Sequence, residues 1–412
     1  METTQKLPKF FATWSNSSNI LNCIIESKWI QSSMDVVMET DHIIVSDGES
    51  VCKIELPGVT LLPDTCRGLK LVSATELHFS IKGQLLQGDE LLQMKVKKCS
   101  LQNETVETIQ KLQNKWFCAV CKQKLLTDRS ILRRVLPLPS ENWSDLADMW
   151  FCHNHGNEDQ PAQKQGRLLP KENECFVGET FVLVARKHVN SADVKITKTG
   201  AVICKRCGRQ LGEVMESHNG TSFQDGVIKF FLHTLLMKDL RFADLIKQDS
   251  SISNRVDLDR FFSGLLQEQS EMYASFRFII ESRSDTVTEN SESGVSTCLL
   301  WMLDSNVQMY RSRSGSMLKF DGNLQVAKTS VIKVLFKCQL CGSNAKRPPD
   351  HVTKSLISLW RKDNTVHCFQ LPHPVFLQLI HLLVQNCKTL PCSQRYLNGF
   401  HMSFIGNSES SS

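Results

Sequence analysis

Short apolar runs, separated by polar turn-forming sequences, recur along the N-terminal part of the chain. They lie at residues 42–45, 51–56, 69–72, 76–82 and 90–96, with breaks such as SDGES, LPDTCRG and KGQLLQGD between them. This rhythm is typical of the strands of a β-meander or sandwich. We therefore expect a β-rich N-terminal domain over residues 1–115.

The rest of the chain mixes strand-like and helix-like patterns. Strand-like runs occur at residues 175–185, 201–204, 274–280, 297–303, 331–336 and 403–405, and we expect 274–280 to pair with 297–303. Apolar residues at helical spacing predict helices over 257–273 and 374–385, whereas residues 226–236 fit either a strand or a helix. Runs of strands with a few helices predict an α+β fold that is mainly antiparallel β.

Composition and charge narrow the class of protein. The 412 residues are 41% hydrophobic and 22% charged, which is usual for a globular chain. The formal net charge of +5 gives no strong case for direct nucleic-acid binding. No apolar run approaches the length of about 20 residues that a membrane span needs, and the N-terminus lacks the apolar core of a secretory signal. We expect a soluble intracellular protein.

Cysteine is unusually frequent for such a chain, at 16 residues. Two Cys-x-x-Cys pairs, Cys118 with Cys121 and Cys204 with Cys207, have the spacing at which a turn presents two thiolates to one zinc ion. Gly208 after the second pair permits the left-handed backbone of such a turn. We predict that all four cysteines hold one structural zinc that clamps distant segments together; two unrelated pairs of buried thiols are the alternative.

A third pair, Cys338 and Cys341, has the same spacing but no second pair to complete a site. Cys298 and His351 are candidate complements, and nothing in the sequence selects either of them. The end of a cysteine-bearing strand explains this pair better than a redox motif does, because no βαβ pattern surrounds it.

The segment of residues 130–160 differs from its surroundings. After two prolines it predicts a short helix whose apolar face carries Trp143, Leu146 and Trp150. That face serves either as core or as a docking surface for a partner protein. Cys152 follows the helix, and its thiolate either enters the open zinc position of a partner enzyme or is an ordinary surface thiol.

Cysteines near the C-terminus are the candidate nucleophiles. Cys392 and Cys387 lie close in sequence to Lys388 and Arg395, and such cations lower the pKa of a thiol. The chain has no P-loop, no GxGxxG after a strand, no Gly-x-Ser-x-Gly and no His-Glu-x-x-His. It therefore lacks the signatures of the common nucleotide-binding, hydrolase and metalloprotease classes.

Several motifs resemble those of one family. They are RVLPLPSENW from Arg134 to Trp143, Trp150 with Cys152 and His153, VICKRC at 202–207 with LGE at 211–213, Leu62 with CRGL at 66–69, and SLW at 358–360. Together these motifs are similar to the HECT-like ubiquitin ligases that bind a cyclin-selective ubiquitin-conjugating enzyme. The similarity extends over most of the chain.

The resemblance implies a ubiquitin-protein ligase, a transferase that accepts ubiquitin from a conjugating enzyme and passes it to substrate proteins. It implies that the segment from Leu211 to Met237 binds the conjugating enzyme. A second role in the family is inhibition of the zinc endonuclease that cleaves pre-mRNA at its 3′ end. For that role the segment from Ser130 to Asp159 would enter the nuclease cleft, and Cys152 would reach the zinc ions of the nuclease.

These inferences divide the chain into parts. We expect an N-terminal β-rich domain (1–115), a zinc-knuckle region (116–225) with an inserted docking segment (130–160), a HECT-like α+β region (226–405) and a disordered tail (406–412). We expect a cytoplasmic protein, with the nucleus as a second compartment. Two functions stand at this point: a ubiquitin ligase with Cys392 or Cys387 as nucleophile, and a non-catalytic nuclease inhibitor or assembly factor that acts through Cys152.

Overall fold

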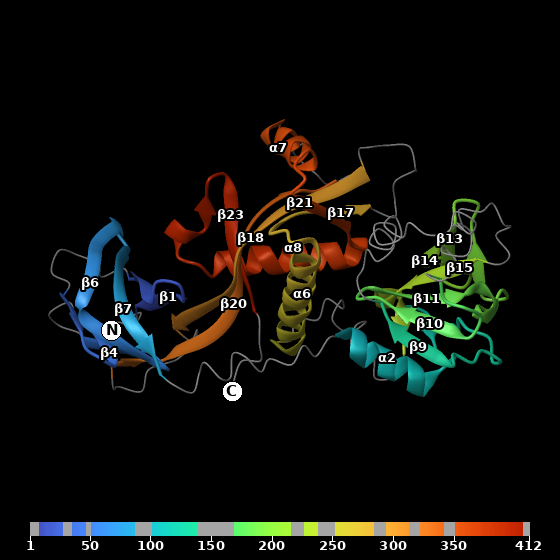
Figure 1. Cartoon of the computed structure of the whole chain (residues 1–412), viewed down its shortest axis with the longest axis horizontal. Helices are drawn as coiled ribbons and strands as arrows, with labels where there is room; N and C mark the ends of the chain where they lie inside the picture. Colours follow the sequence, from blue (N-terminus) through green and yellow to red (C-terminus); the bar gives the residue numbers. More distant parts are fainter. Residues whose placement is uncertain are drawn as a thin grey trace, which may run out of the picture. The chain divides into compact units, whose positions relative to one another are not determined.

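The structure is a computed structural model that describes residues 8–27, 35–46, 51–86, 101–138, 169–215, 226–237, 252–283, 294–312, 322–341 and 351–406. The chain forms two compact units. The first comprises Met1–Lys98, Leu300–Lys337 and His381–Ser412, and the second comprises Cys99–Leu299 and Cys338–Ile380. The division falls within two long strands, β18 (Val295–Ser312) and β20 (Val326–Gln339), and one helix, α8 (His373–Lys388), which Figure 1 labels.

The first unit contains a large sheet with the strand order β22-β23-β20-β18-β1-β2-β7-β6. Besides β18 and β20, its strands are β1 (Lys9–Ser15), β2 (Ile20–Glu26), β6 (Val59–Ser73), β7 (Glu76–Leu85), β22 (Tyr396–Leu397) and β23 (Phe400–Gly406). A smaller sheet, in the order β19-β5-β4-β3, consists of β3 (Asp35–Met38), β4 (His42–Ser46), β5 (Val51–Glu55) and β19 (Asn323–Leu324). Side chains from both sheets, among them Trp14, Ile25, Ile43 and Ile54, share one buried core.

The hairpin of β1 and β2 is an element that the sequence analysis did not predict. Phe10 and Phe11 are both buried, so the two faces of β1 are covered and the usual alternation of apolar and polar residues is lost. The polar residues 16–19 that interrupt the pattern form the turn of the hairpin, where Asn19 has a φ of 51°. The far edge of β1 pairs with β18, for example Phe11 with Arg311.

The second unit contains a β-rich part, residues 101–237, which we call the knuckle module. Its main sheet has the order β12-β13-β14-β15-β11-β10-β9. These strands are β9 (Arg134–Pro137), β10 (Glu174–Val177), β11 (Phe181–Ala185), β12 (Val194–Ile196), β13 (Ala201–Cys204), β14 (Gln210–Met215) and β15 (Val227–Phe231). Helix α2 (Leu101–Leu112) lies against β9, and its Gln102 amide donates hydrogen bonds to the carbonyls of Leu138 and Val177 (Figure 1).

One strand prediction in this module is wrong. The run 175–185 is a hairpin of β10 and β11 instead of a single strand, because Gly178 turns the chain and its N–H donates to the Phe181 carbonyl at 2.8 Å. Continuous apolar character on both sides hides the short turn from a pattern of hydrophobicity.

The remaining part of the second unit contains most of the helices. Helix α6 (Ile252–Tyr273) precedes β17 (Arg277–Arg283), which pairs with β18 and lies parallel to β21 (Val366–Gln370). Helix α7 (His351–Arg361), which the sequence analysis did not predict, buries Thr353, Ile357 and Trp360. The predicted helices at 257–273 and 374–385, and the pairing of 274–280 with 297–303, are confirmed by α6, α8 and the β17–β18 pair.

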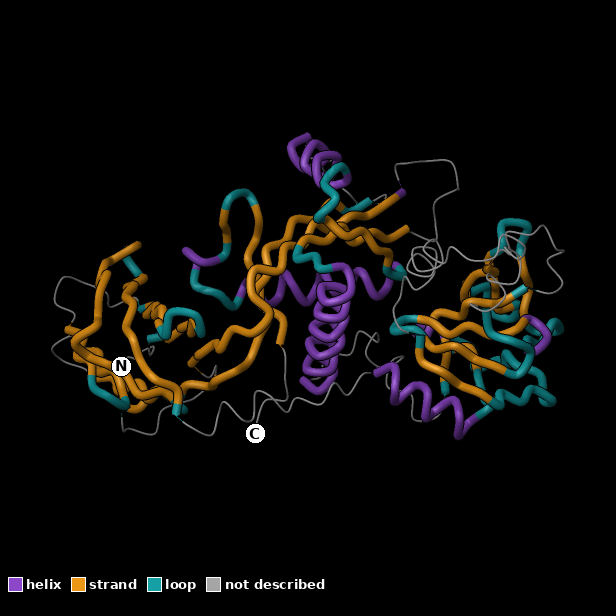
Figure 2. The backbone as a smooth tube through the Cα atoms, viewed as in Figure 1, coloured by secondary structure: helices purple, strands orange, loops and turns teal. Residues whose placement is uncertain are grey.

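Across the described residues the chain is mainly antiparallel β with four helices, so the α+β class is confirmed (Figure 2). None of these helices is both long and apolar enough to cross a membrane. The boundaries that we drew at residues 115 and 225 stay predictions.

Candidate metal centre

Four thiols of the knuckle module converge on one point. They belong to Cys118, Cys121, Cys204 and Cys207, and all four sulfur atoms lie within 4.8 Å of one another. The Sγ atoms of Cys118 and Cys207 are 3.6 Å apart, and those of Cys121 and Cys204 are 3.5 Å apart. The two Cys-x-x-Cys pairs therefore form a single cluster that could hold a metal ion, as the sequence spacing predicts.

Two turns of the same geometry present these thiols. After β8 (Phe117–Cys118), the N–H of Lys122 donates to the Cys118 carbonyl at 2.9 Å, and Lys122 has a φ of 61°. After β13, the N–H of Gly208 donates to the Cys204 carbonyl at 2.9 Å, and Gly208 has a φ of 73°. In each turn the residue four positions after the first cysteine takes the left-handed conformation and reverses the chain.

In the segment from Leu211 to Met237, the described residues 211–215 and 226–237 link the two turns through strand pairing. Its strand β14 continues from the second turn, and β16 (Leu235–Leu236) pairs with β8, which places Leu235 opposite Cys118. Strands β14 and β15 approach so closely at Gly212 that a Cβ there would lie 1.9 Å from the Lys229 carbonyl oxygen. The glycine of the LGE motif is therefore a packing requirement.

The four cysteines differ in their exposure to solvent. Cys118 and Cys204 are buried, and Cys207 is exposed. Burial raises the pKa of Cys118, Cys204 and Cys207. Burial also acts to raise the pKa of Cys121, but hydrogen bonds from the Gln123 N–H and the neighbouring thiols outweigh it and lower that pKa to about 7.

The third Cys-x-x-Cys pair has a different environment. Cys338 lies within β20, and its sulfur is 3.4 Å from the sulfur of Cys298 on β18. Cys341 follows the strand, and its backbone N–H donates to the Ser296 hydroxyl at 3.0 Å. Of the two candidate complements, Cys298 is the one that contacts Cys338.

The two C-terminal candidate nucleophiles differ in exposure. Cys387 lies in α8 with 7% of its surface exposed, and burial raises its pKa. Cys392 is exposed at the start of the short 3-10 helix Cys392–Gln394. The guanidinium of Arg395 donates hydrogen bonds to the carbonyls of Leu390 and Lys388, at 2.8 and 2.9 Å.

A hydrogen-bonded cluster adjoins Cys392 through the next residue. The Ser393 backbone N–H donates to the Glu76 carboxylate at 3.3 Å, and the Ser393 hydroxyl lies 3.2 Å from His78 Nε2. The same ring nitrogen is 3.2 Å from a Glu76 oxygen, and Glu76 is buried. The sequence analysis missed Glu76 and His78, since nothing in a β-strand pattern some 300 residues away points to Ser393.

Other predicted site residues fall elsewhere. Trp143, Leu146, Trp150 and Cys152 lie outside the described residues, as does the stretch 216–225 of the proposed enzyme-binding segment. Ser130, at the start of the predicted nuclease-docking segment, is buried and donates a hydrogen bond to the His188 carbonyl at 3.0 Å.

Comparison with known proteins identifies related chains. A family model described as HECT-like ubiquitin-conjugating enzyme (E2)-binding matches residues 15–402. A mouse protein named as an E3 ubiquitin-protein ligase is 30% identical over 382 residues, covering 90% of both chains. The human protein of the same name is 27% identical over 401 residues, covering 90% of this chain and 91% of the human one. No solved structure matches significantly.

Proposed function

The chain belongs to the family of HECT-like proteins that bind a ubiquitin-conjugating enzyme (E2), and on this basis we propose that it is a ubiquitin-protein ligase. In this role it binds an E2 that carries ubiquitin and transfers the ubiquitin to substrate proteins. The observation that carries the proposal is the family match over residues 15–402. Relatives named as ubiquitin ligases support it, since they align with 90% of the chain.

Cys392 is the residue that we propose to accept ubiquitin. Its thiolate attacks the carbonyl carbon of the ubiquitin thioester on the E2, so that a new sulfur–carbon bond forms and the E2 cysteine leaves as a thiolate. A lysine amine of the substrate then attacks the same carbonyl carbon and releases Cys392. The exposure of Cys392 supports this role, because a nucleophile must reach a second protein, whereas Cys387 is buried. The Glu76–His78 pair holds Ser393 and so positions the turn that carries the nucleophile.

For the E2 we propose a surface on strands β14 and β15. Much of the segment from Leu211 to Met237 is core, and its outward side carries the ion pair of Lys229 with Glu213 at 3.1 Å. The ammonium of Lys229 lies 5.9 Å from the centre of the half-buried Phe231 ring. An aromatic ring beside paired charges suits a protein interface, because it combines apolar area with polar partners.

We also propose that the four-thiol cluster binds one structural zinc ion. Tetrahedral zinc with bonds of about 2.3 Å to sulfur sets the sulfur atoms about 3.8 Å apart. The distances of 3.5 and 3.6 Å between the paired sulfurs are close to that value. Four protein thiols leave no coordination position for water, which is the arrangement of structural zinc sites.

A ubiquitin-transfer assay with a panel of E2 enzymes tests the ligase function. We expect ubiquitin conjugates, and on non-reducing gels an adduct that reducing agents remove. Cys392→Ala should abolish the adduct, whereas Cys387→Ala and Cys368→Ala should retain it; Cys368 is the matched control because it is also exposed. Conjugates without any adduct would refute covalent transfer, and failure to bind or discharge every E2 would refute the ligase function.

The second function from the sequence analysis, inhibition of a zinc endonuclease through Cys152, stays a prediction. The mouse and human relatives are named for ubiquitin ligation, and their names mention no nuclease. The four cysteines of the cluster must be reduced to bind zinc, and this requirement supports our proposal of a reducing compartment, the cytoplasm with the nucleus as a second location.

A further inference from the structure

Strands β6 and β7, which lie side by side in Figure 1, carry several cations on one face. On β7 the side chains of His78, Ser80 and Lys82 alternate with buried ones, so they share a face of the sheet. On β6 Lys70 lies opposite His78 and Arg67 lies opposite Ser80, which places both cations on that same face. We call these five residues the basic face. Its lysines and its arginine are exposed and have no acidic partner among the described residues.

The carboxylates near the basic face neutralise little of its charge. Glu76 is buried, and its carboxylate bonds to His78 and to the Ser393 backbone N–H. Glu26, on the neighbouring strand β2, is paired with Lys9 at 3.4 Å. The other acidic residue of β6 and β7 is Asp64. Three exposed cations therefore face solvent with one exposed carboxylate on the same two strands.

The basic face adjoins the turn that carries Cys392. The Ser393 hydroxyl lies 3.2 Å from His78 Nε2, so the residue after Cys392 contacts the face directly. On the preceding side, the Arg395 guanidinium donates to the Lys388 carbonyl at 2.9 Å, and Lys388 is itself exposed. A carbonyl is a neutral acceptor and leaves the charge of the guanidinium in place. Cations thus occur both on the sheet that contacts this turn and at the end of the helix that precedes it.

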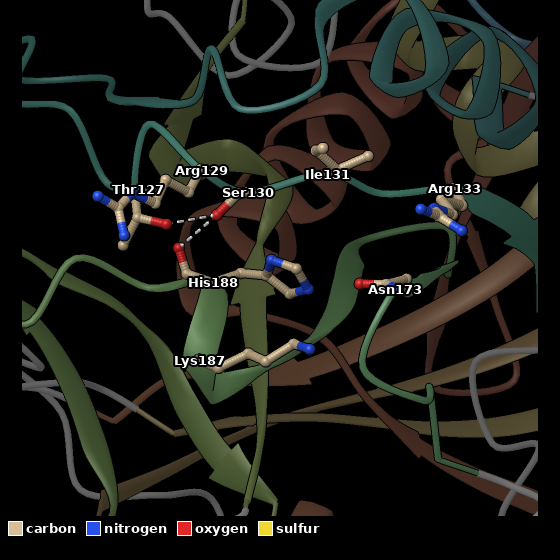
Figure 3. A pocket seen from close by; sticks show the side chains of 8 residues that line it. All are labelled: Thr127, Arg129, Ser130, Ile131, Arg133, Asn173, Lys187 and His188. Atoms are coloured by element: carbon tan, nitrogen blue, oxygen red, sulfur yellow. Dashed lines mark hydrogen bonds between the residues drawn. The ribbon is translucent and has the colours of Figure 1, made fainter.

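A second basic region, in the knuckle module, is built differently. It is a pocket in which Arg129 and Arg133 lie at opposite ends, as Figure 3 shows. Its Lys187 is paired with Glu172. The charges of that pocket act at separate points, whereas the register of β6 with β7 sets the cations of the basic face side by side. The basic face therefore suits a ligand with several charges better than the pocket does.

We propose that the basic face binds an extended acidic segment of the substrate protein and so holds an acceptor lysine near Cys392. Side chains two residues apart in an extended chain are separated by about 6.8 Å, which is also the spacing of alternate side chains along β7. Alternate Asp or Glu residues of the segment therefore meet successive positions of the face. That the bound protein is a substrate rests on the proposed ligase function; the binding of an acidic segment does not.

Exposed apolar side chains favour a polypeptide over a nucleic acid as the ligand. Leu69 and Leu71 flank Lys70 on β6, and each has 54% of its surface exposed. A polypeptide can place apolar side chains against them beside its carboxylates. Proteins that bind single-stranded nucleic acid instead present aromatic rings on which bases stack. Strand β6 has no aromatic residue, and the imidazole of His78 is already in contact with Glu76 and Ser393.

Binding measurements on the full chain, without any E2, test the surface. The probes are a Gly/Ser peptide with one lysine and four glutamates at alternate positions, the same peptide with glutamines, and a single-stranded RNA oligonucleotide. We expect the glutamate peptide to bind, and Arg67→Gln with Lys70→Gln to weaken its association about tenfold, since each exposed ion pair is worth about threefold. Salt at about 1 M should remove the preference for glutamate, because it screens exposed charges beyond about 3 Å.

A matched control and a transfer assay complete the test. Lys195→Gln with Lys198→Gln removes two exposed cations of the knuckle module, outside the basic face, and should leave peptide binding unchanged. With E2 and ubiquitin present, the lysine of the glutamate peptide should receive ubiquitin faster than that of the glutamine peptide. Arg67→Gln with Lys70→Gln should remove most of this difference.

The outcomes separate the alternatives. Equal binding of the two peptides, or equal affinity of the wild type and the Arg67/Lys70 double variant, would overturn the basic face as a binding surface. Tighter binding of RNA that depends on the same two residues would overturn the choice of an acidic protein. An adduct on Cys392 without any preference for the glutamate peptide would refute this inference and leave the ligase function standing. Preferential binding without adduct or conjugates would refute the ligase function, and with it the assignment of the acidic protein as a substrate.

Discussion

Two of the three Cys-x-x-Cys sequences in this chain form turns, and the third lies at the end of a strand. In the first two, Lys122 and Gly208 take a left-handed conformation and their N–H groups bond back to the first cysteine. Both thiols of each pair therefore face the same point. Cys338 instead lies in the extended backbone of β20, where successive side chains alternate between faces, and its thiol meets Cys298 on β18. The same Cys-x-x-Cys spacing therefore forms a cluster that could hold a metal ion only where the backbone reverses direction.

The largest expected difference between these cysteines is in folding. Cys118→Ser should unfold the knuckle module, because the free energy of metal binding, about 10–16 kcal/mol in zinc-finger peptides, is part of the folding free energy. Cys341→Ser should leave folding and bound metal unchanged. Elemental analysis of the purified proteins and circular dichroism with and without a strong chelator measure both effects.

The wild type should contain one zinc per chain, and chelation should lower its thermal stability. A wild type that folds without metal, or a Cys118→Ser variant as stable as Cys341→Ser, would refute a structural zinc. In that case the four thiols would be in contact without a metal, as those of Cys298 and Cys338 are.

The sheet that carries the second turn allows the next test. A side chain at Gly212 would push β14 away from the Lys229 carbonyl of β15, and so would separate the strands that link the two turns. We expect Gly212→Ala to lower the free energy of unfolding by about 3 kcal/mol, at the upper end for overpacked positions. Gly264→Ala in α6 is the control, since a Cβ there has nothing within 4 Å. Denaturant titration of both variants gives the comparison, and equal stability would contradict the close approach.

The Cys298–Cys338 contact predicts a different chemistry from that of the cluster. Peroxide should oxidise the partly exposed Cys338 to a sulfenic acid with release of water, and the Cys298 thiol should then displace a second water to form a disulfide. We expect the link to stabilise the oxidised chain by about 2 kcal/mol. Peptide mapping after the free thiols are trapped identifies which cysteines are linked. Oxidation of the metal-loaded cluster before Cys338, or a Cys338–Cys341 link, would be evidence against the assignment.

The sequence predicts well those features that depend on a local or periodic pattern of residues. The helix α6 and the turn at Cys204 depend on residues close in the chain, namely apolar spacing and a glycine after the second cysteine. By contrast, β1 is buried on both faces and pairs with β18, so its own residues carry no alternating pattern. The contact of Ser393 with Glu76 and that of Cys338 with Cys298 arise only when distant segments fold together. The spacing of residues along the chain does not predict such contacts.

The two turns also differ from each other, and this difference predicts the smallest effect. They share one backbone geometry, but the left-handed position is Lys122 in one turn and Gly208 in the other, with φ of 61° and 73°. A residue with a Cβ is disfavoured in this conformation, whereas glycine adopts it freely. Gly208→Ala should therefore lower the free energy of unfolding by about 1 kcal/mol, although open space surrounds the position. Lys122→Gly should raise the free energy of unfolding by about 0.5 kcal/mol, because it relieves that strain but loses the 3.3 Å hydrogen bond from the Lys122 ammonium to the Ala119 carbonyl.

Denaturant titration of metal-loaded protein measures both changes, with Lys205→Gly, outside the left-handed position, as the control. Effects of the same sign at Lys122 and Gly208 would show that side-chain contacts, and not the shared backbone, decide the stability of the turns.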